Sequence, residues 1–138
     1  PISSIDCYPT LLELAGAKAA EHEIDGRSLV ALLREEPFER EALFWHYPHY
    51  NKHPQSAPVS IVRSGSWKLI EFLESGRLEL YDLSRDPGEK NDVRLEHPEI
   101  EKKLLKQLTD IVTSGATRLD VESKNDTPPW DDLGWIVK

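Results

Sequence analysis

Four short runs decide the fold of this 138-residue chain: Ala42-Leu-Phe-Trp-His-Tyr47, Val59–Arg63, Trp67–Leu73 and Leu78–Leu83. All four are rich in the aromatic, β-branched and large apolar residues that fill strands, and Pro48 ends the first. The turns Ser64-Gly65-Ser66 and Glu74-Ser75-Gly76 separate the last three runs and suit tight hairpins. The sequence therefore predicts one strand, a ring-rich loop and then a three-strand meander.

The same stretch differs in charge from the rest of the chain. Between Ala42 and Ile70 there is no Asp or Glu, whereas the whole chain has a net charge of −8. The basic side chains of this stretch are Lys52, Arg63, Lys68, His46, His49 and His53. A cationic, aromatic strip in an acidic protein is the best functional clue in the sequence. The acidic remainder argues against nucleic-acid and anionic-membrane partners, which need a broad basic face.

A helix is predicted at the start of the chain, within Pro1–Ala15. Apolar residues recur there at helical spacing, with Gly16 as the stop: Ile5, Tyr8, Leu12 and Ala15. Because Pro9 lacks a backbone donor, the helix is expected either over the whole range or from Tyr8, after a turn at Ser3–Cys7. We expect this helix to pack its apolar stripe against something.

Two further helices are predicted. Ser28 caps a short one over Leu29–Arg34, whose Leu29, Leu32 and Leu33 are expected to face inward. The stronger one begins at Pro98 and ends at Ser114. Its apolar stripe comprises Ile100, Leu104, Leu108, Ile111 and Val112, and Lys102, Lys103 and Lys106 are expected on the solvated face.

These elements predict an α+β fold, in which a four-stranded antiparallel sheet carries the Pro98–Ser114 helix across one face, with short N-terminal helices before it. Residues 1–115 are expected to form the folded part. Residues 116–138 read as an irregular tail that docks on a surface, because Trp130 and Trp135 are unlikely to face water. Cys7 is the only cysteine, and no run can span a bilayer. The absence of methionine suggests a processed chain or a piece of a longer protein.

Five phrases stand in order along residues 1–98. They are Asp6-Cys7-Tyr8-Pro9-Thr10-Leu11-Leu12-Glu13-Leu14-Ala15-Gly16, Asp25-Gly26-Arg27-Ser28-Leu29, Leu43-Phe44-Trp45-His46-Tyr47-Pro48-His49-Tyr50, Val62-Arg63-Ser64-Gly65-Ser66-Trp67-Lys68-Leu69-Ile70, and Leu80-Tyr81-Asp82-Leu83 with Asp86-Pro87-Gly88-Glu89 and Asn91. Together they resemble the C-terminal subdomain of type I sulfatases, the arylsulfatase-like members of the alkaline-phosphatase-like superfamily. In that family this subdomain is a four-stranded antiparallel sheet with a packed helix, which agrees with the elements above.

The resemblance implies that bond-breaking belongs to another part of the polypeptide. Family members hydrolyse sulfate esters with a formylglycine and a calcium ion, both held by an N-terminal domain that normally precedes the point where this chain starts. That domain and a sulfated small molecule or glycan are the implied partners, and a periplasmic or secreted location is expected. Within this chain the resemblance implies no catalytic residue, metal or cofactor, but one wall of the substrate cleft.

Cys7-Tyr8-Pro9-Thr10 imitates the start of the motif that is converted to formylglycine. Leu11 stands where that motif requires an arginine, and no carboxylates cluster nearby to hold a cation. Free cysteine often behaves as a small hydrophobic residue. Cys7 is therefore expected to be structural.

His46 and His49 are candidate contacts for a sulfated substrate, because imidazole groups hydrogen-bond hydroxyl and sulfate oxygens. Packing against a partner domain is the alternative. A His-x2-His-x3-His metal set with His53 is disfavoured, because a strand end and a Pro-bearing loop do not hold that spacing on one face.

Lys52, Arg63 and Lys68 are candidate substrate contacts that would give the cleft a positive rim. The structural alternative for Arg63 and Lys68 is an ion pair with Glu71 or Asp82. The Asp86-Pro87-Gly88-Glu89 segment is expected to form a type II turn, tied together by Glu89 and Asn91. We expect Trp67 and Tyr81 to lie in a core or in a contact between domains. Stacking against a sugar ring is the second alternative for both.

Two functions of other classes stay open at this point. The chain could be an autonomous module that binds acidic or sulfated glycans through the strip from Trp45 to Lys68. It could instead be a structural dimerisation domain.

Overall fold

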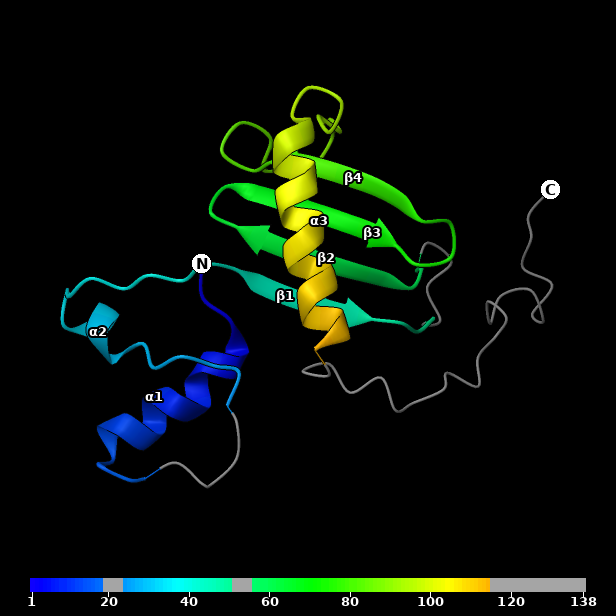
Figure 1. Cartoon of the computed structure of the whole chain (residues 1–138). Coiled ribbons are helices and arrows are strands. Elements are labelled where there is room, and N and C mark those ends of the chain that lie inside the picture. The colour runs from blue at the N-terminus through cyan, green and yellow to red at the C-terminus, as the bar shows by residue number, and fades with distance from the viewer. Residues whose placement is uncertain (19–23, 51–55, 115–138) are drawn as a thin grey trace. The chain divides into compact units, whose positions relative to one another are not determined.

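A computed structural model of the chain describes residues 1–18, 24–50 and 56–114 (Figure 1). The chain divides into two compact units, Pro1–Leu43 and Phe44–Lys138. Its elements in chain order are η1 (Ser4–Asp6), α1 (Cys7–Leu14), α2 (Val30–Leu33), β1 (Leu43–Tyr47), β2 (Val59–Ser64), β3 (Trp67–Phe72), β4 (Arg77–Asp82) and α3 (Pro98–Thr113). None of the helices in the described part is long and apolar enough to cross a bilayer. The predicted docking tail, residues 116–138, lies outside the described residues.

The second unit is built on a four-stranded sheet with the strand order β1-β2-β3-β4. β2 pairs antiparallel with β3, and β3 pairs antiparallel with β4. The arrows of β1 and β2 also run in opposite directions in Figure 1. The predicted α+β architecture and the meander are confirmed, with strand ends that differ from the sequence expectation by one residue.

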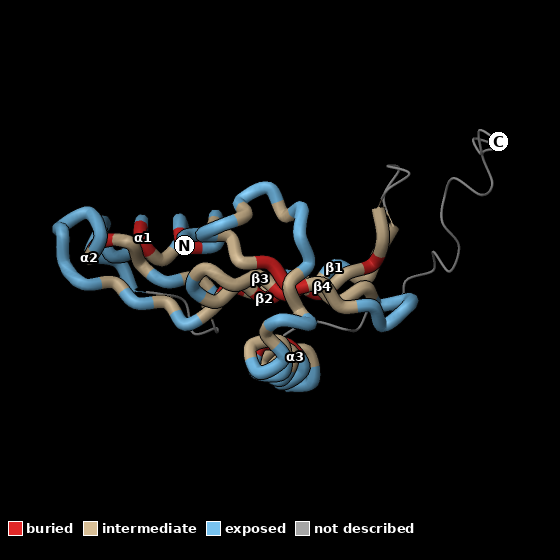
Figure 2. The backbone as a smooth tube through the Cα atoms, turned by 90° about the horizontal axis from the view of Figure 1, so that it is seen from above, coloured by how far each residue is buried: buried red, intermediate tan, exposed pale blue. Residues whose placement is uncertain are grey.

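The core of the second unit lies between the sheet and α3. Val62, Leu69 and Leu80 are register partners on one sheet face, and all three side chains are fully buried. Leu104 and Leu108 of α3 are buried as well, and α3 contacts β2 and β3. Figure 2 shows α3 on one side of the sheet. The expected packing of this helix on one face is therefore confirmed, and its lysines are exposed as predicted.

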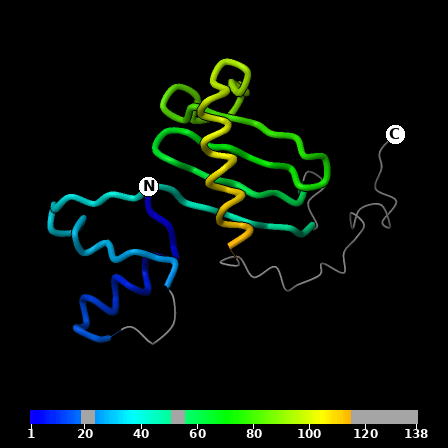
Figure 3. Tube along the Cα trace, in the orientation of Figure 1, coloured from blue at the N-terminus to red at the C-terminus, as the bar shows by residue number. Residues whose placement is uncertain are grey.

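The segment between β4 and α3 follows the outer edge of β4. Val93 donates its backbone N–H to Leu80 O at 2.9 Å, and Leu80 N–H donates to the Asp92 carboxylate at 3.0 Å. Figure 3 follows the backbone through this segment into α3. These bonds occupy backbone groups that an edge strand would otherwise present to another chain.

In the first unit, α1 ends as the sequence predicts. Gly16 has φ +64°, and its N–H donates to Glu13 O at 3.1 Å while Ala17 N–H donates to Leu12 O at 3.0 Å. This pair of bonds is the Schellman arrangement, which a glycine accommodates without strain. Pro9 is the third residue of α1, where a backbone N–H would have no partner within the helix. The expected turn before the helix is η1.

The burial of the N-terminal helices is the reverse of the prediction. Ile5 and Tyr8 are exposed, whereas Asp6 and Thr10 are buried. In α2 the buried residue is Val30, and the expectation that Leu32 and Leu33 face inward is wrong, since both are exposed. The reason is that the polar side of η1 and α1 hydrogen-bonds the segment before α2. The predicted Ser28 cap does accept a bond from Val30 N–H, at 3.2 Å.

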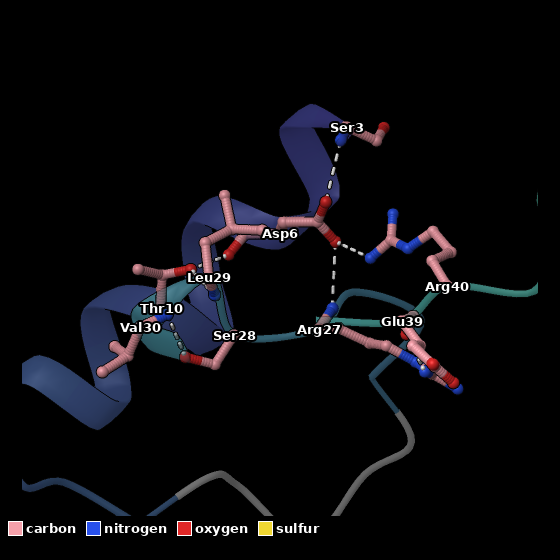
Figure 4. A network of polar contacts seen from close by, with 9 residues as sticks. All are labelled: Ser3, Asp6, Thr10, Arg27, Ser28, Leu29, Val30, Glu39 and Arg40. Atoms are coloured by element: carbon pink, nitrogen blue, oxygen red, sulfur yellow. Dashed lines mark hydrogen bonds and ion pairs between the residues drawn. The ribbon is translucent and has the colours of Figure 1, made fainter. Parts of the chain in front are cut away.

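Asp6 is the centre of that polar network (Figure 4). Its carboxylate accepts from Ser3 N–H at 2.8 Å, from Arg27 N–H at 2.9 Å and from Arg40 Nη2 at 2.5 Å. Thr10 Oγ1 donates to Asp6 O at 2.6 Å and accepts from Leu29 N–H at 2.9 Å. Burial alone raises the pKa of Asp6, but these donors outweigh it and lower that pKa to about 2.

Gly26 makes this close contact between the two segments possible. A Cβ atom at this position would lie 2.0 Å from Ile5 O and 2.6 Å from Ile5 C. Only glycine lets the backbone approach so closely, and the adjacent Arg27 N–H can then reach the Asp6 carboxylate. Gly26 therefore serves the packing of the first unit.

Candidate functional site

The sheet face opposite α3 carries part of the cationic and aromatic strip, whereas His46 and Trp67 lie on the face that α3 covers. Side chains alternate between the two faces of a strand, so each strand places every second residue on this open face. Val62, Leu69 and Leu80 face α3, so the residues that follow or precede them directly face the other way. Arg63, Lys68 and Tyr81 therefore lie on the open face. His46 bonds Ser60 on the helix-covered side, and its neighbours Trp45 and Tyr47 therefore lie on the open side. The candidate site is this set: Trp45, Tyr47, Arg63 and Lys68.

Arg63 and Lys68 are brought together as direct cross-strand partners of β2 and β3. Lys68 Nζ lies 2.6 Å from the Glu89 Oε2 oxygen, and both side chains are mostly buried. The expected ion pair with Glu71 or Asp82 is wrong for Lys68. Glu71 and Asp82 belong to the opposite sheet face, so their carboxylates point away from Lys68.

Arg63 differs from Lys68 in its surroundings. Its Nε is buried, and no hydrogen-bond partner for that atom occurs among the described residues. No ion pair to Arg63 is present in that part of the chain either. Arg63 is therefore the cation of this face whose charge is not already balanced by a carboxylate at contact distance.

Glu89 reaches Lys68 because of the turn that holds it. Asp86 accepts from Lys90 N–H at 2.7 Å and from Asn91 N–H at 2.8 Å, and Glu89 N–H donates to Asp86 O at 3.2 Å. The two amide bonds to the carboxylate, that of Asn91 N–H first and then that of Lys90 N–H, lower the pKa of Asp86. The expected type II turn is wrong, because the positive φ of +52° falls on Glu89 and not on Gly88.

His46 faces the helix-covered side, away from Arg63 and Lys68. Its Nδ1 lies 2.7 Å from Ser60 Oγ, and Ser60 is fully buried. Nε2 is buried and lacks a hydrogen-bond partner within the described residues. Burial lowers the pKa of His46, Glu71 opposes this shift, and His49 adds to it. The structure therefore splits the predicted substrate contacts between two faces.

The end of β1 holds one more predicted contact. The ring of His49 meets the ring of Tyr47 edge-on, with 5.6 Å between their centroids. Lys52 and His53 lie outside the described residues.

Trp67 and Tyr81 occupy structural positions, as expected. Trp67 contacts the ring of His97 at 4.8 Å, at the start of α3. Tyr81 is buried, and its hydroxyl donates to the Glu79 carboxylate at 2.8 Å. Burial first, and then this carboxylate, raise the pKa of Tyr81 to about 12. Tyr81 is therefore a hydrogen-bond donor at every physiological pH.

The described residues do not fit calcium or a formylglycine. Within residues 1–18, 24–50 and 56–114, no group of three His, Cys, Asp or Glu side chains could hold a metal ion. Cys7 is an exposed free cysteine at the start of α1. Leu11 stands where the motif that is converted to formylglycine has an arginine.

Two site-building residues were not predicted. For Asp6 the sequence predicts only a place in the first helix or in the turn before it, although the Asp-x3-Thr spacing before an Asp-Gly pair could have signalled a buried network. Glu89 was assigned to its own turn. No local signal connects it to Lys68, which lies 21 positions earlier in the chain.

The first unit carries a separate apolar surface. It is formed by Ile2, Ile5, Tyr8, Leu11 and Leu14, which we call the η1–α1 apolar surface. Leu11 is 65% exposed and Leu14 is 60% exposed, although both belong to a helix of the folded unit. Large apolar side chains that are exposed so close together in the chain are typical of an interaction site.

Comparison with known proteins gives consistent matches. A family model described as "N-sulphoglucosamine sulphohydrolase, C-terminal" matches residues 2–114. A sulfatase of Formosa agariphila is 38% identical over 108 residues, which are 70% of this chain and 19% of that protein. Arylsulfatase K of Mus musculus is 30% identical over 131 residues, with 90% of this chain and 24% of that protein covered.

A solved structure matches as well. It is BT4656 in complex with its substrate D-glucosamine-2-N,6-O-disulfate, with a TM-score of 0.68 and 26% identity. The match covers 88% of this chain and 25% of that chain. The chain thus spans between 19% and 25% of the length of these three relatives.

Proposed function

This chain belongs to the family of sulfatase C-terminal domains, and from that premise we propose that it is the C-terminal part of an enzyme that hydrolyses sulfate esters. The nucleophile, the calcium ion and the formylglycine belong, on this proposal, to an N-terminal part of the same polypeptide. The length of the relatives supports this, because the match covers at most a quarter of each of the three. The role of this chain is to dock on that part and to form one wall of the substrate cleft.

The reversed burial of the N-terminal helices is the observation that supports docking of this chain on the N-terminal part. A helix of an independent domain buries its apolar stripe, yet here Asp6 and Thr10 are buried and Leu11 and Leu14 are exposed. A second surface that covers the η1–α1 apolar surface would restore the usual arrangement. Covering both leucine side chains would contribute a few kcal/mol, at about 1.5–3 kcal/mol for each fully buried side chain.

The side chains on the open face of the sheet are the evidence for the proposed wall of the cleft. Trp45 and Tyr47 offer rings for a sugar, and Arg63 offers a guanidinium whose planar fork suits the oxygens of a sulfate group. Arg63 takes first place among the proposed contacts because Glu89 already neutralises Lys68. Lys68, His49 and Lys52 remain proposed contacts of the same cleft, whereas His46 faces the helix-covered side of the sheet and is not proposed as a contact of it.

A sulfatase assay on the full-length gene product and on the 138-residue chain tests whether catalysis requires the N-terminal part. The full-length gene product is expected to release sulfate from N- and O-sulfated glucosamine or from an aryl sulfate, and the 138-residue chain is expected to release none. Glucosamine sulfates come first because the matched structure holds such a substrate. Turnover by the 138-residue chain, purified to constant specific activity, would contradict the proposal.

A matched pair of variants tests the docking. Leu11→Asp places a charge on the η1–α1 apolar surface, and Leu95→Asp places one on a leucine that is 86% exposed in the second unit. In the full-length protein Leu11→Asp is expected to cost at least about 2 kcal/mol of unfolding free energy, and Leu95→Asp less than about 0.5 kcal/mol. Equal costs would show that Leu11 stays in water.

A second pair tests the cleft. Arg63→Gln in the full-length enzyme is expected to raise KM roughly tenfold with little effect on kcat, because one charge-assisted hydrogen bond to the substrate is lost. Arg85→Gln is the control, since that side chain is 87% exposed and lies outside the sheet. Saturable binding of sulfated oligosaccharides by the 138-residue chain alone would favour the autonomous binding module instead.

A further inference from the structure

The first unit contains a cavity that the docking of an apolar helix does not explain. It has a volume of about 580 Å³ and is lined by Pro1, Arg27, Phe38, Glu39, Arg40 and Glu41. All of its lining residues belong to the first unit.

Arg40 is the residue of interest in this cavity. Its side chain is only 4% exposed, and its Nη2 is bound to the Asp6 carboxylate. Nη1 is also buried, but no hydrogen-bond partner for it occurs in the described part of the chain. Figure 4 shows one terminal nitrogen of Arg40 directed at Asp6 and the other directed away from it. A buried donor of a charged group that lacks an acceptor costs folding free energy. We therefore expect an acceptor for this nitrogen in the complete protein.

The charges around the cavity define the acceptor. Asp6 already neutralises Arg40, and the acidic residues Glu39 and Glu41 are among those that line the same cavity. The guanidinium of Arg27 is engaged with Glu39 O at 2.9 Å. A further carboxylate or sulfate would therefore meet like charges, whereas a cation could not accept a hydrogen bond. A neutral oxygen, such as a peptide carbonyl or a side-chain amide, satisfies both conditions.

We propose that a peptide segment of the N-terminal part enters this cavity and presents a neutral oxygen to Arg40 Nη1. This inference rests on the proposed function, which supplies the missing polypeptide. The relatives extend well beyond the matched region, since at most 25% of their length is covered. Phe38 also lines the cavity, with its ring centroid 5.7 Å from Arg40 Cζ, and offers the entering segment apolar surface. The Asp6–Arg40 pair thus orients Arg40 for a contact between two parts of one protein.

Hydrogen exchange at the Arg27 amide measures this contact. That amide is bound to Asp6, so its protection reports on opening of the network that holds Arg40. Arg40→Lys keeps a positive charge for Asp6 but removes the second terminal nitrogen. Its effect is compared between the 138-residue chain and the full-length gene product, with Arg85→Lys as an exposed control.

We expect Arg40→Lys to reduce protection in the full-length protein by roughly tenfold more than in the 138-residue chain, because only the former supplies the acceptor. Equal reductions in both proteins would overturn the proposal. A crystal structure of the full-length product gives a second test. A neutral oxygen from outside residues 1–138 within hydrogen-bond distance of Arg40 Nη1 supports the proposal, and a carboxylate, a water alone or an oxygen from residues 1–138 contradicts it.

The sulfatase assay separates this inference from the proposed function. Sulfate release by the full-length product with equal protection losses means that the cavity proposal alone fails. An extra protection loss without sulfate release from any sulfate ester means that the interface exists and that the proposed activity is wrong.

Discussion

Arg63 and Lys68 face each other across the β2–β3 hairpin, and Lys68 alone of the two has a carboxylate at contact distance among the described residues. Its partner Glu89 comes from a turn after β4 that Asp86 closes through the amides of Lys90 and Asn91. The sulfatase-like phrase Asp86-Pro87-Gly88-Glu89 with Asn91 therefore has a physical role: it places a carboxylate over the sheet. Lys68 is thereby neutralised, whereas Arg63 has no carboxylate at contact distance among the described residues.

Glu89→Gln tests the ion pair. The substitution keeps the shape of the side chain but removes its charge, and we expect the second unit to lose about 1 kcal/mol of unfolding free energy, at the upper end for a partly exposed pair. Glu74→Gln, in the exposed turn before β4, is expected to change it by less than about 0.5 kcal/mol. Urea unfolding followed by tryptophan fluorescence measures both. Indistinguishable midpoints for the two variants would mean that the pair contributes nothing.

His46 makes the second unit sensitive to acid. Its pKa in the folded state is lowered by burial, so the unfolded chain binds the proton more readily. Stability is therefore complete above the unfolded pKa of 6.5 and is lost as the pH falls below it. The urea midpoint of the wild type is expected to fall between about pH 8 and about pH 5 by more than that of His46→Gln. Parallel pH profiles would rule out His46 as the cause.

Asp6 gives the first unit a second dependence on acid, in a lower range. Its pKa is about 2 in the folded state against 3.8 as the ordinary value. The stabilisation is therefore present above pH 3.8 and is lost as the pH falls toward 2. A shift of this size corresponds to about 2 kcal/mol.

Asp6→Asn is expected to remove this acid dependence and to destabilise the first unit by about 3 kcal/mol, because Arg40 is left buried without its counter-charge. Hydrogen exchange at the amides of Arg27 and Leu29, corrected for intrinsic rates, follows the effect in this unit alone. Protection that declines with acid in the variant as it does in the wild type would contradict the assignment to Asp6.

Gly26→Ala tests the close approach of the two segments in the first unit. The new Cβ would meet Ile5 O at 2.0 Å, and the backbone must shift to relieve it. We expect a loss of about 3 kcal/mol or more in the first unit, seen as faster exchange of the Arg27 amide. Gly88→Ala is the control, because its nearest atom would be Lys90 Cε at 3.4 Å, on a side chain that can move. Similar effects of the two substitutions would refute the steric explanation.

The sheet and its covering helix were predictable from the sequence. Alternating apolar residues from Val59 to Leu83, with glycine turns between them, leave little choice of register, since a slip of one residue would turn Val62, Leu69 and Leu80 outward. The stop at Gly16 and the start at Pro98 were also predictable, because both depend on local backbone chemistry.

The sequence alone thus determined the secondary structure, the sheet order and the location of a cationic strip, all of which depend on residues near one another in the chain. Only the tertiary structure decided that His46 and Arg63 lie on opposite faces, that Glu89 neutralises Lys68 and that Asp6 is buried with Arg40. These arrangements depend on contacts between residues 14 to 34 positions apart. Their geometry follows from strand register and from the close approach at Gly26, and no periodicity in the sequence records either.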